Sequence, residues 1–461
     1  MDIPDILKVA DEVVFVKTGE HLDYLQEAIL RGTLQGQKYW KIAEETHASE
    51  GHVRDVGSKL WKILSEGLGE EITKANFRAK IDKGSVYQNN NVSSPLVHQT
   101  ITVNNNVNIC PETVRSPTSP SNSQQTSSQT YIDLSDAPEI FRFYDRTPQL
   151  ATLENWIICD RTRLIALLGI NGIGKTTLSL RLIEQIKTHF DYIIYRSLRF
   201  YPTLNATLTN LLQIFPQQTD IPQNIETQIS QLLNYLRQYR CLIILDDVQM
   251  LFCSGQLAGQ YKTGYEDYQL FFKLIAEVNH NSCLLIDSWE KPREVAKLER
   301  GNNYVQTLVL CSLGLAAKEI LKDRKLSDEE TWESLIDTYQ GNPLWLELTA
   351  STIQDLFCGS VSDFLQCDEP ILDESLQGQL DQQFQRLTQQ ELAVMIQLAK
   401  ESELVALPDI LKIVQLSVSD LVNAMRSLGM RLLLDAKEED KTTFFSLNTV
   451  MKEYVKNRYM R

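Results

Sequence analysis

Hydrophobic and polar positions divide the chain into a helical beginning, an alternating middle and a helical end. Before residue 84, apolar residues recur at spacings of three, four and seven, as in amphipathic helices: Ile6, Val9, Val13, then Leu22, Leu25, Ile29. In the middle, four short apolar runs alternate with helical stretches and are predicted strands: Leu164–Leu168, Tyr192–Arg196, Cys241–Leu245 and Cys283–Ile286. Such alternation predicts an α/β fold with a doubly wound parallel sheet.

After about residue 300 the strands are expected to stop. Three helical stretches follow, at 316–323, 329–339 and 344–357. From about Leu376, further helical runs at 389–400, 408–414 and 419–428 precede two β-rich segments, Arg431–Leu434 and Thr443–Leu447, separated by the polar turn KEEDK. Helices followed by a two-stranded ribbon are typical of a winged helix. We therefore expect a helical domain at 301–375 and a winged-helix domain at 376–461.

Residues 85–136 are rich in Asn, Ser, Thr, Gln and Pro and carry almost no charge. Such a stretch cannot bury enough apolar area to offset its chain entropy, so a disordered linker is predicted. Within it, four apolar residues share the parity of a strand: Ile101, Val103, Val107 and Ile109. The segment is therefore either an extended linker or a short self-associating β segment.

Composition narrows the class of protein. The 461 residues contain 45 Lys and Arg against 60 Asp and Glu, a formal net charge of −15, which disfavours non-specific nucleic-acid binding. The longest apolar runs are far too short to span a membrane, and the acidic N-terminus is unlike a signal peptide. The eight cysteines form no C-x-x-C pair and are expected to be buried reduced thiols. A soluble cytoplasmic protein without membrane association is expected.

The strongest chemical signal is GINGIGKTT at 169–177, between a predicted strand and a predicted helix. It matches the phosphate-loop pattern G-x-x-x-x-G-K-[ST] in the context that this pattern requires. Its glycines would turn backbone N–H groups toward phosphates, and the helix N-terminus adds positive potential. Lys175 is expected to neutralise the β- and γ-phosphates, and Thr176 to ligate Mg²⁺. The expected nucleotide-binding residues of this loop are Gly169, Ile170, Asn171, Gly172, Ile173, Gly174, Lys175, Thr176 and Thr177.

A second element follows about seventy residues later, where the apolar run CLIIL ends in two acids. Asp246 would hold Mg²⁺ through water, and Asp247 is the candidate catalytic residue, placed to orient or deprotonate an attacking water. Two adjacent acids also fit a solvated strand end. Their pairing with the phosphate loop favours the site.

The order of these motifs resembles the NB-ARC module of STAND signalling ATPases over residues 137–461. The matching segments are GINGIGKTTL, YRSL, LDDV and GNPL, followed by the winged helix. The resemblance implies a nucleotide-binding domain at 137–300 that uses ADP or ATP with Mg²⁺, and a switch that is ADP-bound at rest and homo-oligomeric with ATP. YDRT resembles the family's opening motif, whose arginine, here Arg146, lies near the nucleotide base. GNPL resembles the family's G-L-P-L motif, whose proline, here Pro343, packs on the adenine.

Two departures from the family concern the phosphates. A sensor arginine that touches the γ-phosphate normally follows the fourth strand, where this chain has Trp289. Arg293, one turn later, is an alternative donor. The family's winged-helix histidine, which contacts the ADP β-phosphate, is replaced by Asn448. These changes keep nucleotide binding as the expectation, and both weak ATPase activity and binding without turnover are compatible with them.

Residues 39–65 have the pattern of a helix–turn–helix. YWKIAEETH is the predicted first helix, residues 48–50 are the turn and HVRDVGSKLWKIL is the second helix. Their shared core is expected to contain Ile42, Ala43, Val53, Val56 and Leu60. Residues 1–84 are similar to the helix–turn–helix domain that begins bacterial vMAP-type and NB-ARC proteins, notably cyanobacterial ones.

Charge favours protein docking over DNA binding for this N-terminal domain. Its second helix offers four side chains to a groove, His52, Arg54, Lys59 and Lys62. However, residues 1–84 hold 12 Lys and Arg against 15 Asp and Glu, a net charge of −3, whereas DNA-binding domains carry a basic stripe. We expect an adaptor that docks a partner protein; the alternative is a nucleotide-gated transcription regulator.

STAND proteins usually continue into a repeat array that senses the stimulus. No period of 34 to 45 residues is visible in this chain. The sensor is therefore expected to be a separate protein, or the repeats to have been lost.

Overall fold

The computed structural model describes residues 3–18, 22, 24–34, 37–46, 50–68, 72–74, 76–77, 130–216, 221–367, 369–401, 403–439 and 442–460. The chain divides into two compact units, residues 1–127 and 128–461. Three predictions lie wholly or mostly outside the described residues: the disordered linker over residues 85–129, the strand-like segment within it, and Ala48 and Ser49 of the N-terminal turn.

The first unit consists of helices packed through their apolar stripes: α1 (Ile3–Thr18), α2 (Tyr24–Leu34), α3 (Tyr39–Thr46) and α4 (Glu50–Leu68). Helices α3 and α4 are the predicted helix–turn–helix pair. Four of its predicted core residues are buried, Ile42, Ala43, Val53 and Leu60, whereas Val56 is partly exposed. The Trp61 indole donates a hydrogen bond to the Tyr39 hydroxyl at 2.8 Å, which fixes α4 against α3.

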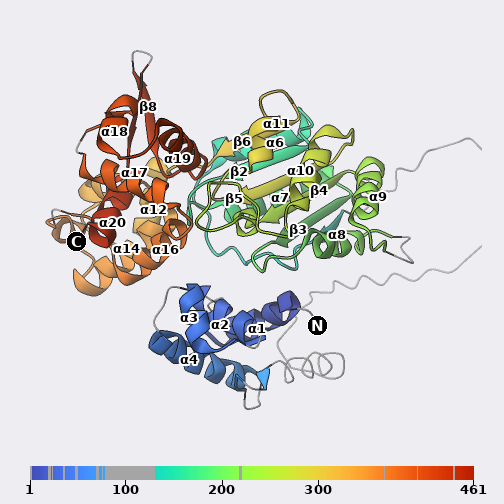
Figure 1. Ribbon diagram of the computed structural model, residues 1–461, viewed down its shortest axis with the longest axis horizontal. Coiled ribbons are helices and arrows are strands. Elements are labelled where there is room, and N and C mark those ends of the chain that lie inside the picture. Colours follow the sequence, from blue (N-terminus) through green and yellow to red (C-terminus); the bar gives the residue numbers. More distant parts are fainter. Residues whose placement is uncertain are drawn as a thin grey trace, which may run out of the picture. The chain divides into compact units, whose positions relative to one another are not determined.

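The second unit is built on a six-stranded sheet in the order β1-β3-β4-β5-β2-β6 (Figure 1). All neighbouring strands are parallel. The strands are β1 (Tyr131–Asp133), β2 (Leu164–Leu168), β3 (Tyr192–Ser197), β4 (Cys241–Asp246), β5 (Cys283–Ser288) and β6 (Val305–Val309). The four strands predicted from apolar runs are confirmed as β2 to β5.

The two edge strands were not predicted. Strand β1 lies within the stretch assigned to the linker, and its three residues are partly or fully exposed. Strand β6 pairs with β2, so the prediction that strands stop near residue 300 is wrong. Edge strands pair on one side and are half-solvated, so they lack the continuous apolar run that marks the central strands. Only Val305 is fully buried in β6.

Helices cover both faces of the sheet, as expected of a doubly wound fold (Figure 1). Side chains of one strand parity, such as Ile165 and Leu167, form a core with α6 (Thr147–Ile158) and α7 (Lys175–Ile186). The opposite parity forms a core with helices of the other face, α8 (Leu204–Leu212), α9 (Ile225–Gln238) and α10 (Asp267–Glu277). The short helix α11 (Arg293–Leu298) follows β5.

The rest of this unit shares one apolar core. Its helical part contains α12 (Lys318–Asp323), α13 (Trp332–Thr338), α14 (Pro343–Leu356) and α15 (Val361–Phe364). The winged-helix region contains α16 (Glu374–Phe384), α17 (Gln389–Lys400), β7 (Val405–Ala406), α18 (Leu407–Ile413), α19 (Val418–Met430), β8 (Asp435–Glu439), β9 (Thr442–Ser446) and α20 (Thr449–Tyr459). The three strands pair antiparallel in the order β7-β9-β8.

One wing strand differs from its prediction. Residues Arg431–Leu434 were expected to form it, but β8 is the polar segment Asp435–Glu439. Arg431 and Leu433 are buried, because the chain leaving α19 packs into the interior before the wing begins. The exposed strand itself is polar, so its sequence resembles a turn.

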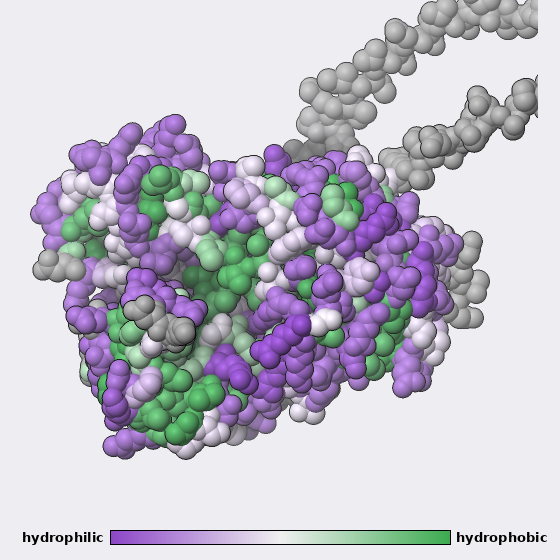
Figure 2. Space-filling model, turned by 90° about the horizontal axis from the view of Figure 1, so that it is seen from above, coloured by the Kyte–Doolittle hydropathy of each residue, from purple (hydrophilic) through white to green (hydrophobic). Residues whose placement is uncertain are grey.

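The surface mixes hydrophilic and hydrophobic areas on the face drawn in Figure 2. The most exposed large apolar side chain among the described residues is Phe141, with 80% exposure. No described helix is long and apolar enough to cross a membrane. Cysteine burial is confirmed for Cys241 and Cys283 but is wrong for four exposed cysteines in helix ends and loops, Cys159, Cys311, Cys358 and Cys367.

Candidate nucleotide-binding site

The glycine loop has the backbone that its sequence predicts. It leaves β2 after Leu168 and enters α7 at Lys175. Gly172 and Gly174 have φ angles of +75° and +98°, a left-handed conformation that glycine adopts without a steric cost. A Cβ on Gly172 would lie 2.4 Å from the Leu344 Cβ, so this position also needs glycine for close packing against α14. A Cβ on Gly174 would meet nothing within 4 Å, so its requirement is conformational.

The lysine of the loop is folded over the loop itself. The Lys175 ammonium donates hydrogen bonds to the carbonyls of Gly169, at 2.9 Å, and Ile170, at 3.2 Å. The side chain is only 7% exposed. Burial lowers the pKa of Lys175, and the nearby Asp246 opposes this shift. The ammonium is thus held at the loop by two neutral carbonyl groups. A bound phosphate would give it a negatively charged partner instead.

The two predicted metal-binding residues are in direct contact. The Thr176 hydroxyl donates a hydrogen bond to Asp246 Oδ2 at 2.5 Å, which joins the start of α7 to the end of β4. The Tyr195 hydroxyl of β3 donates to the same oxygen at 2.6 Å. Asp246 Oδ1 accepts the backbone N–H of Asp247 at 2.7 Å. A fixed carboxylate beside a hydroxyl supplies the oxygen ligands that Mg²⁺ prefers.

Asp247, the candidate catalytic residue, has an unusual backbone conformation and an altered pKa. Its φ of +60° is uncommon for a residue with a side chain. The Gln249 amide donates to Asp247 Oδ1 at 2.8 Å, and the Ser197 hydroxyl donates to Oδ2 at 3.4 Å. Desolvation and the neighbouring Asp246 raise the pKa of Asp247 to about 6. A carboxyl that titrates near neutral pH is suited to accepting a proton.

A third acid at this sheet edge was not predicted. Asp287 lies at the end of β5, next to β4, and is fully buried. Its Oδ2 accepts a hydrogen bond from Ser179 of α7 at 2.8 Å, whereas Oδ1 has no hydrogen-bond partner in the described part of the chain. Burial and the charge of Asp246 raise the pKa of Asp287 well above its usual range. The sequence signal for Asp287 was an aspartate directly after the apolar run Cys283–Ile286, as Asp246 follows the run Cys241–Leu245. No sequence signal identified Tyr195.

The Arg146 side chain binds backbone carbonyls of the glycine loop and of the segment after β6. Its guanidinium donates to the carbonyls of Cys311, at 2.8 Å, Ser312, at 3.2 Å, and Ile173, at 3.0 Å. The side chain is buried. Arg146 therefore connects the loop to the segment that follows β6.

The GNPL motif lies directly on the loop. Pro343 is the first residue of α14, and Asn342 precedes it as the helix cap. The Asn342 amide donates to the Asn171 carbonyl at 3.0 Å, and the Leu344 N–H donates to the Gly172 carbonyl at 3.3 Å. The Asn171 amide in turn donates to Gln379 of α16 at 2.6 Å. The loop thus contacts both the helical part and α16. Ile170 is partly buried between two cores, and Thr177 is partly exposed on α7.

Asn448 and Arg293, the possible phosphate contacts, and Trp289, which stands in place of the sensor arginine, all contact other groups. Asn448 accepts the Met451 N–H at 2.9 Å and caps α20, and no hydrogen bond joins it to the described loop. The Trp289 side chain lines a cavity of about 10 Å³ with Gln383 and Leu433 of the winged-helix region. The Arg293 guanidinium donates to the carbonyls of Ala258 and Leu257.

Comparisons with known proteins agree with this organisation. Residues 1–84 match the family described as vWA-MoxR associated protein N-terminal HTH, and residues 147–251 match the NB-ARC domain family. An uncharacterised WD repeat-containing protein of the cyanobacterium Nostoc sp. is 37% identical over 349 residues, which cover 72% of this chain. The chain spans 27% of that relative's length.

The solved structures that match this chain include two Pyrococcus proteins. A Walker-type ATPase of Pyrococcus abyssi has a TM-score of 0.48 at 14% identity, over 68% of this chain and 96% of its own. A STAND protein with a tetratricopeptide repeat sensor from Pyrococcus horikoshii has a TM-score of 0.34 at 16% identity, over 74% of this chain and 45% of its own.

The two family matches cover the helix–turn–helix unit and the strand–loop–helix that carries the phosphate-loop motif. The chain therefore carries an NB-ARC nucleotide-binding domain and, before it, a helix–turn–helix domain of the vWA-MoxR associated protein type.

Proposed function

We propose that this protein is a STAND-type molecular switch that binds ADP or ATP with Mg²⁺ in the cytoplasm. It is ADP-bound at rest, assembles into a homo-oligomer with ATP, and docks a partner protein of a signalling or defence pathway through residues 1–84. The observation that carries the proposal is the contact of Thr176 with Asp246 beside the buried Lys175, in an NB-ARC domain.

The residues present fit a nucleotide phosphate chain. The left-handed glycines Gly172 and Gly174 turn the loop backbone, and Lys175 supplies a buried cation next to it. The loop residues 169–177 hold the phosphates in this proposal, with the N-terminus of α7 adding its positive potential. Pro343 packs on the base, at the point where its helix meets the loop.

The same residues fit Mg²⁺. Thr176 and Asp246 are its proposed ligands, and the Tyr195 hydroxyl holds the Asp246 carboxylate in position. Bound Mg²⁺ would neutralise part of the phosphate charge. Asp247 orients or deprotonates an attacking water in any hydrolysis. Because Trp289 and Arg293 contact other groups, we propose slow hydrolysis and a preference for ADP.

The loop's contacts supply a route from nucleotide to domain arrangement. Asn171 and Gly172 contact Asn342, Leu344 and Gln379 across the start of the helical part. A phosphate that moved Asn171 and Gly172 would shift α14, which contacts their carbonyls, and α16, which contacts the Asn171 side chain. This direct coupling supports a switch over a housekeeping ATPase.

Protein docking is supported by the charges of α4. The Arg54 guanidinium forms an ion pair with Glu50 at 2.7 Å on the exposed face of the helix. An arginine that is paired with a carboxylate attracts a DNA phosphate less strongly, since the carboxylate repels the phosphate.

The experiment is the identification of nucleotide bound to the purified full-length chain. The protein is denatured, and released nucleotides are separated and quantified beside the oligomeric mass from light scattering. The proposal expects near-stoichiometric ADP and a low-order species. Chain free of nucleotide that also fails to bind added ADP with Mg²⁺ would contradict it.

A further inference from the structure

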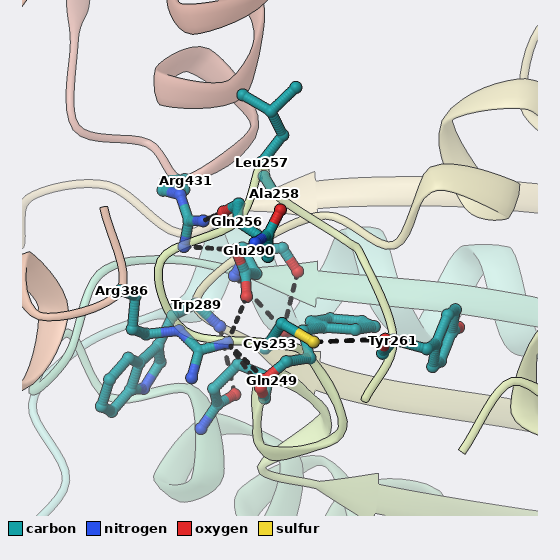
Figure 3. Close-up of polar contacts among 12 residues, drawn as sticks. Gln249, Cys253, Gln256, Leu257, Ala258, Tyr261, Trp289, Glu290, Arg386 and Arg431 are labelled. Atoms are coloured by element: carbon teal, nitrogen blue, oxygen red, sulfur yellow. Dashed lines mark hydrogen bonds and ion pairs between the residues drawn. The ribbon is translucent and has the colours of Figure 1, made fainter. Parts of the chain in front are cut away.

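One buried glutamate receives two arginines from the winged-helix region. Glu290 follows β5 and is 1% exposed. Arg386 Nη2 lies 2.6 Å from Glu290 Oε1, and Arg431 Nη1 lies 2.6 Å from Oε2. Figure 3 shows the Glu290 carboxylate between the two guanidinium groups. Each carboxylate oxygen thus has its own cation.

The arginines also bind the backbone of the segment that follows β4. Arg386 Nη2 donates to the Gln249 carbonyl at 2.8 Å, and Arg431 Nη2 donates to the Gln256 carbonyl at 2.6 Å (Figure 3). Arg431 Nε forms a further ion pair with the buried Glu391 of α17 at 3.1 Å. Two glutamates and two arginines therefore make an electrically balanced cluster.

The charge of Glu290 is neutralised only while the winged-helix region, which carries both arginines, stays in contact with the α/β part. A buried ion pair is costly to break by loss of one partner, because the remaining charge is left unpaired out of water. If α16 and α19 moved away, Glu290 would lose both cations at once. The cluster consequently opposes separation strongly, although its formation also carries a desolvation cost.

Backbone hydrogen bonds mark the same contact. The Gly255 N–H donates to the Arg386 carbonyl at 3.0 Å, and the Lys291 N–H donates to the Met430 carbonyl at 2.9 Å. Both pair a residue of the α/β part with one of the winged-helix region. They can exist only while the two parts are together, so their amide protons report on the contact.

One residue connects this cluster to the nucleotide site. The Gln249 side chain donates to Asp247 Oδ1 at 2.8 Å and accepts the Trp289 N–H at 3.3 Å, while its carbonyl accepts from Arg386. Gln249 is fully buried. Asp247 and Arg386 thus contact the same residue, Asp247 through the side chain of Gln249 and Arg386 through its backbone carbonyl.

We infer that Glu290, Arg386 and Arg431 form a charge latch that holds the winged-helix region on the α/β part, and that Gln249 couples the latch to Asp247. The coupling rests on the proposed function; the latch does not. Arg386 and Arg431 are positioning residues that act through Glu290.

The test is hydrogen exchange by mass spectrometry on the nucleotide-free full-length chain. Glu290→Gln keeps the shape of the side chain and removes its charge. We expect the peptides that contain the Gly255 and Lys291 amides to exchange at least ~100-fold faster, as for loss of a buried partner. Strand β5 should keep its protection. The matched control is Glu333→Gln, which breaks the exposed ion pair with Lys318 and should leave both peptides unchanged.

A second variant, Arg386→Met, tests the latch even if Glu290→Gln fails to fold. Arg386→Met leaves Glu290 paired with Arg431 and should accelerate the Gly255 peptide by ~10-fold or more. Unchanged exchange at Gly255 and Lys291 in either folded variant would overturn the latch. Equal acceleration in β5 would also overturn it, since the cluster would then stabilise the whole fold rather than the contact. Because nucleotide is absent, loss of ADP binding cannot mimic either outcome.

Discussion

The Thr176 hydroxyl and the Asp246 carboxylate meet at 2.5 Å, although 70 positions separate them in the chain. This hydrogen bond joins the first turn of α7 to the end of β4. Two motifs that the sequence offers separately therefore form one site. Tyr195, from the adjacent strand, completes the support of the carboxylate.

Thr176→Val should reduce the effect of Mg²⁺ on nucleotide affinity. The variant keeps the shape of the side chain but removes the proposed ligand oxygen. We expect the gain in ATP affinity on adding Mg²⁺ to fall ~10-fold, the scale of one polar interaction with a charged partner. Calorimetric titration with and without Mg²⁺ measures it. Thr152→Val is the control, because Thr152 is a partly exposed residue of α6 whose hydroxyl binds only the Pro148 carbonyl among the described hydrogen bonds. An equal loss in both variants would refute the assignment.

Trp289→Arg should destabilise the protein rather than restore a sensor. The side chain faces Gln383 and Leu433, in a cavity that Arg386 and Arg431 also line, so a third guanidinium there is repelled. We expect a loss of ~2 kcal/mol in unfolding free energy, measured by denaturant titration, with little loss in Trp289→Phe. Unchanged stability together with a gain in ATP affinity would instead support a sensor role at this position.

His280 should make stability depend on pH below neutrality. Burial, opposed by hydrogen bonding to Ile275, lowers the pKa of His280 to about 4 from its ordinary value of 6.5. The folded state therefore favours neutral histidine. Its contribution is complete above pH 6.5 and is lost as the pH falls toward 4, by ~3 kcal/mol in total. Thermal unfolding in this range should depend less on pH in His280→Asn. The exposed His189→Asn should behave like the parent chain; parental behaviour of His280→Asn would disprove the effect.

The helix–turn–helix unit should not bind duplex DNA measurably near physiological salt. Its residues 1–84 carry a net charge of −3, and Arg54 is paired with Glu50. Fluorescence anisotropy with the full-length chain tests this. Sub-micromolar binding that Arg54→Ala abolishes would favour the transcription-regulator alternative. The logarithm of its association constant should then fall with the logarithm of the salt concentration, by about 0.9 per neutralised phosphate.

The sequence predicted the central fold well because burial leaves a local signal. Strands β2 to β5 are continuous apolar runs, and the helices that cover them have regular apolar spacing. The strands β1, β6 and β8 were not predicted, because edge and wing strands are polar or half-exposed and so lack a continuous apolar run. Their pairing partners, rather than their own residues, determine their structure.

The sequence indicated those parts of the candidate site whose residues belong to a short, continuous motif. The loop and the two acids at the end of the CLIIL run follow such patterns, whereas Tyr195, Gln249 and Asp287 gain their roles from contacts between distant segments. The roles that the family resemblance implies for Asn448 and Arg146 stay predictions. Asn448 caps its own helix, and Arg146 is occupied with backbone carbonyls beside the loop.

The central claim is that residues 169–177 bind adenine nucleotide, and the affinity of Lys175→Ala for ADP tests it most directly. The ammonium lies at the loop carbonyls and contributes nothing to an apolar core, so the variant should fold. Lys187→Ala, which removes an exposed lysine paired with Glu184 just after α7, is the matched control. Calorimetric titration should give ADP affinity at least ~100-fold weaker for Lys175→Ala and parental for Lys187→Ala. Parental ADP affinity in a folded Lys175→Ala variant would contradict the claim.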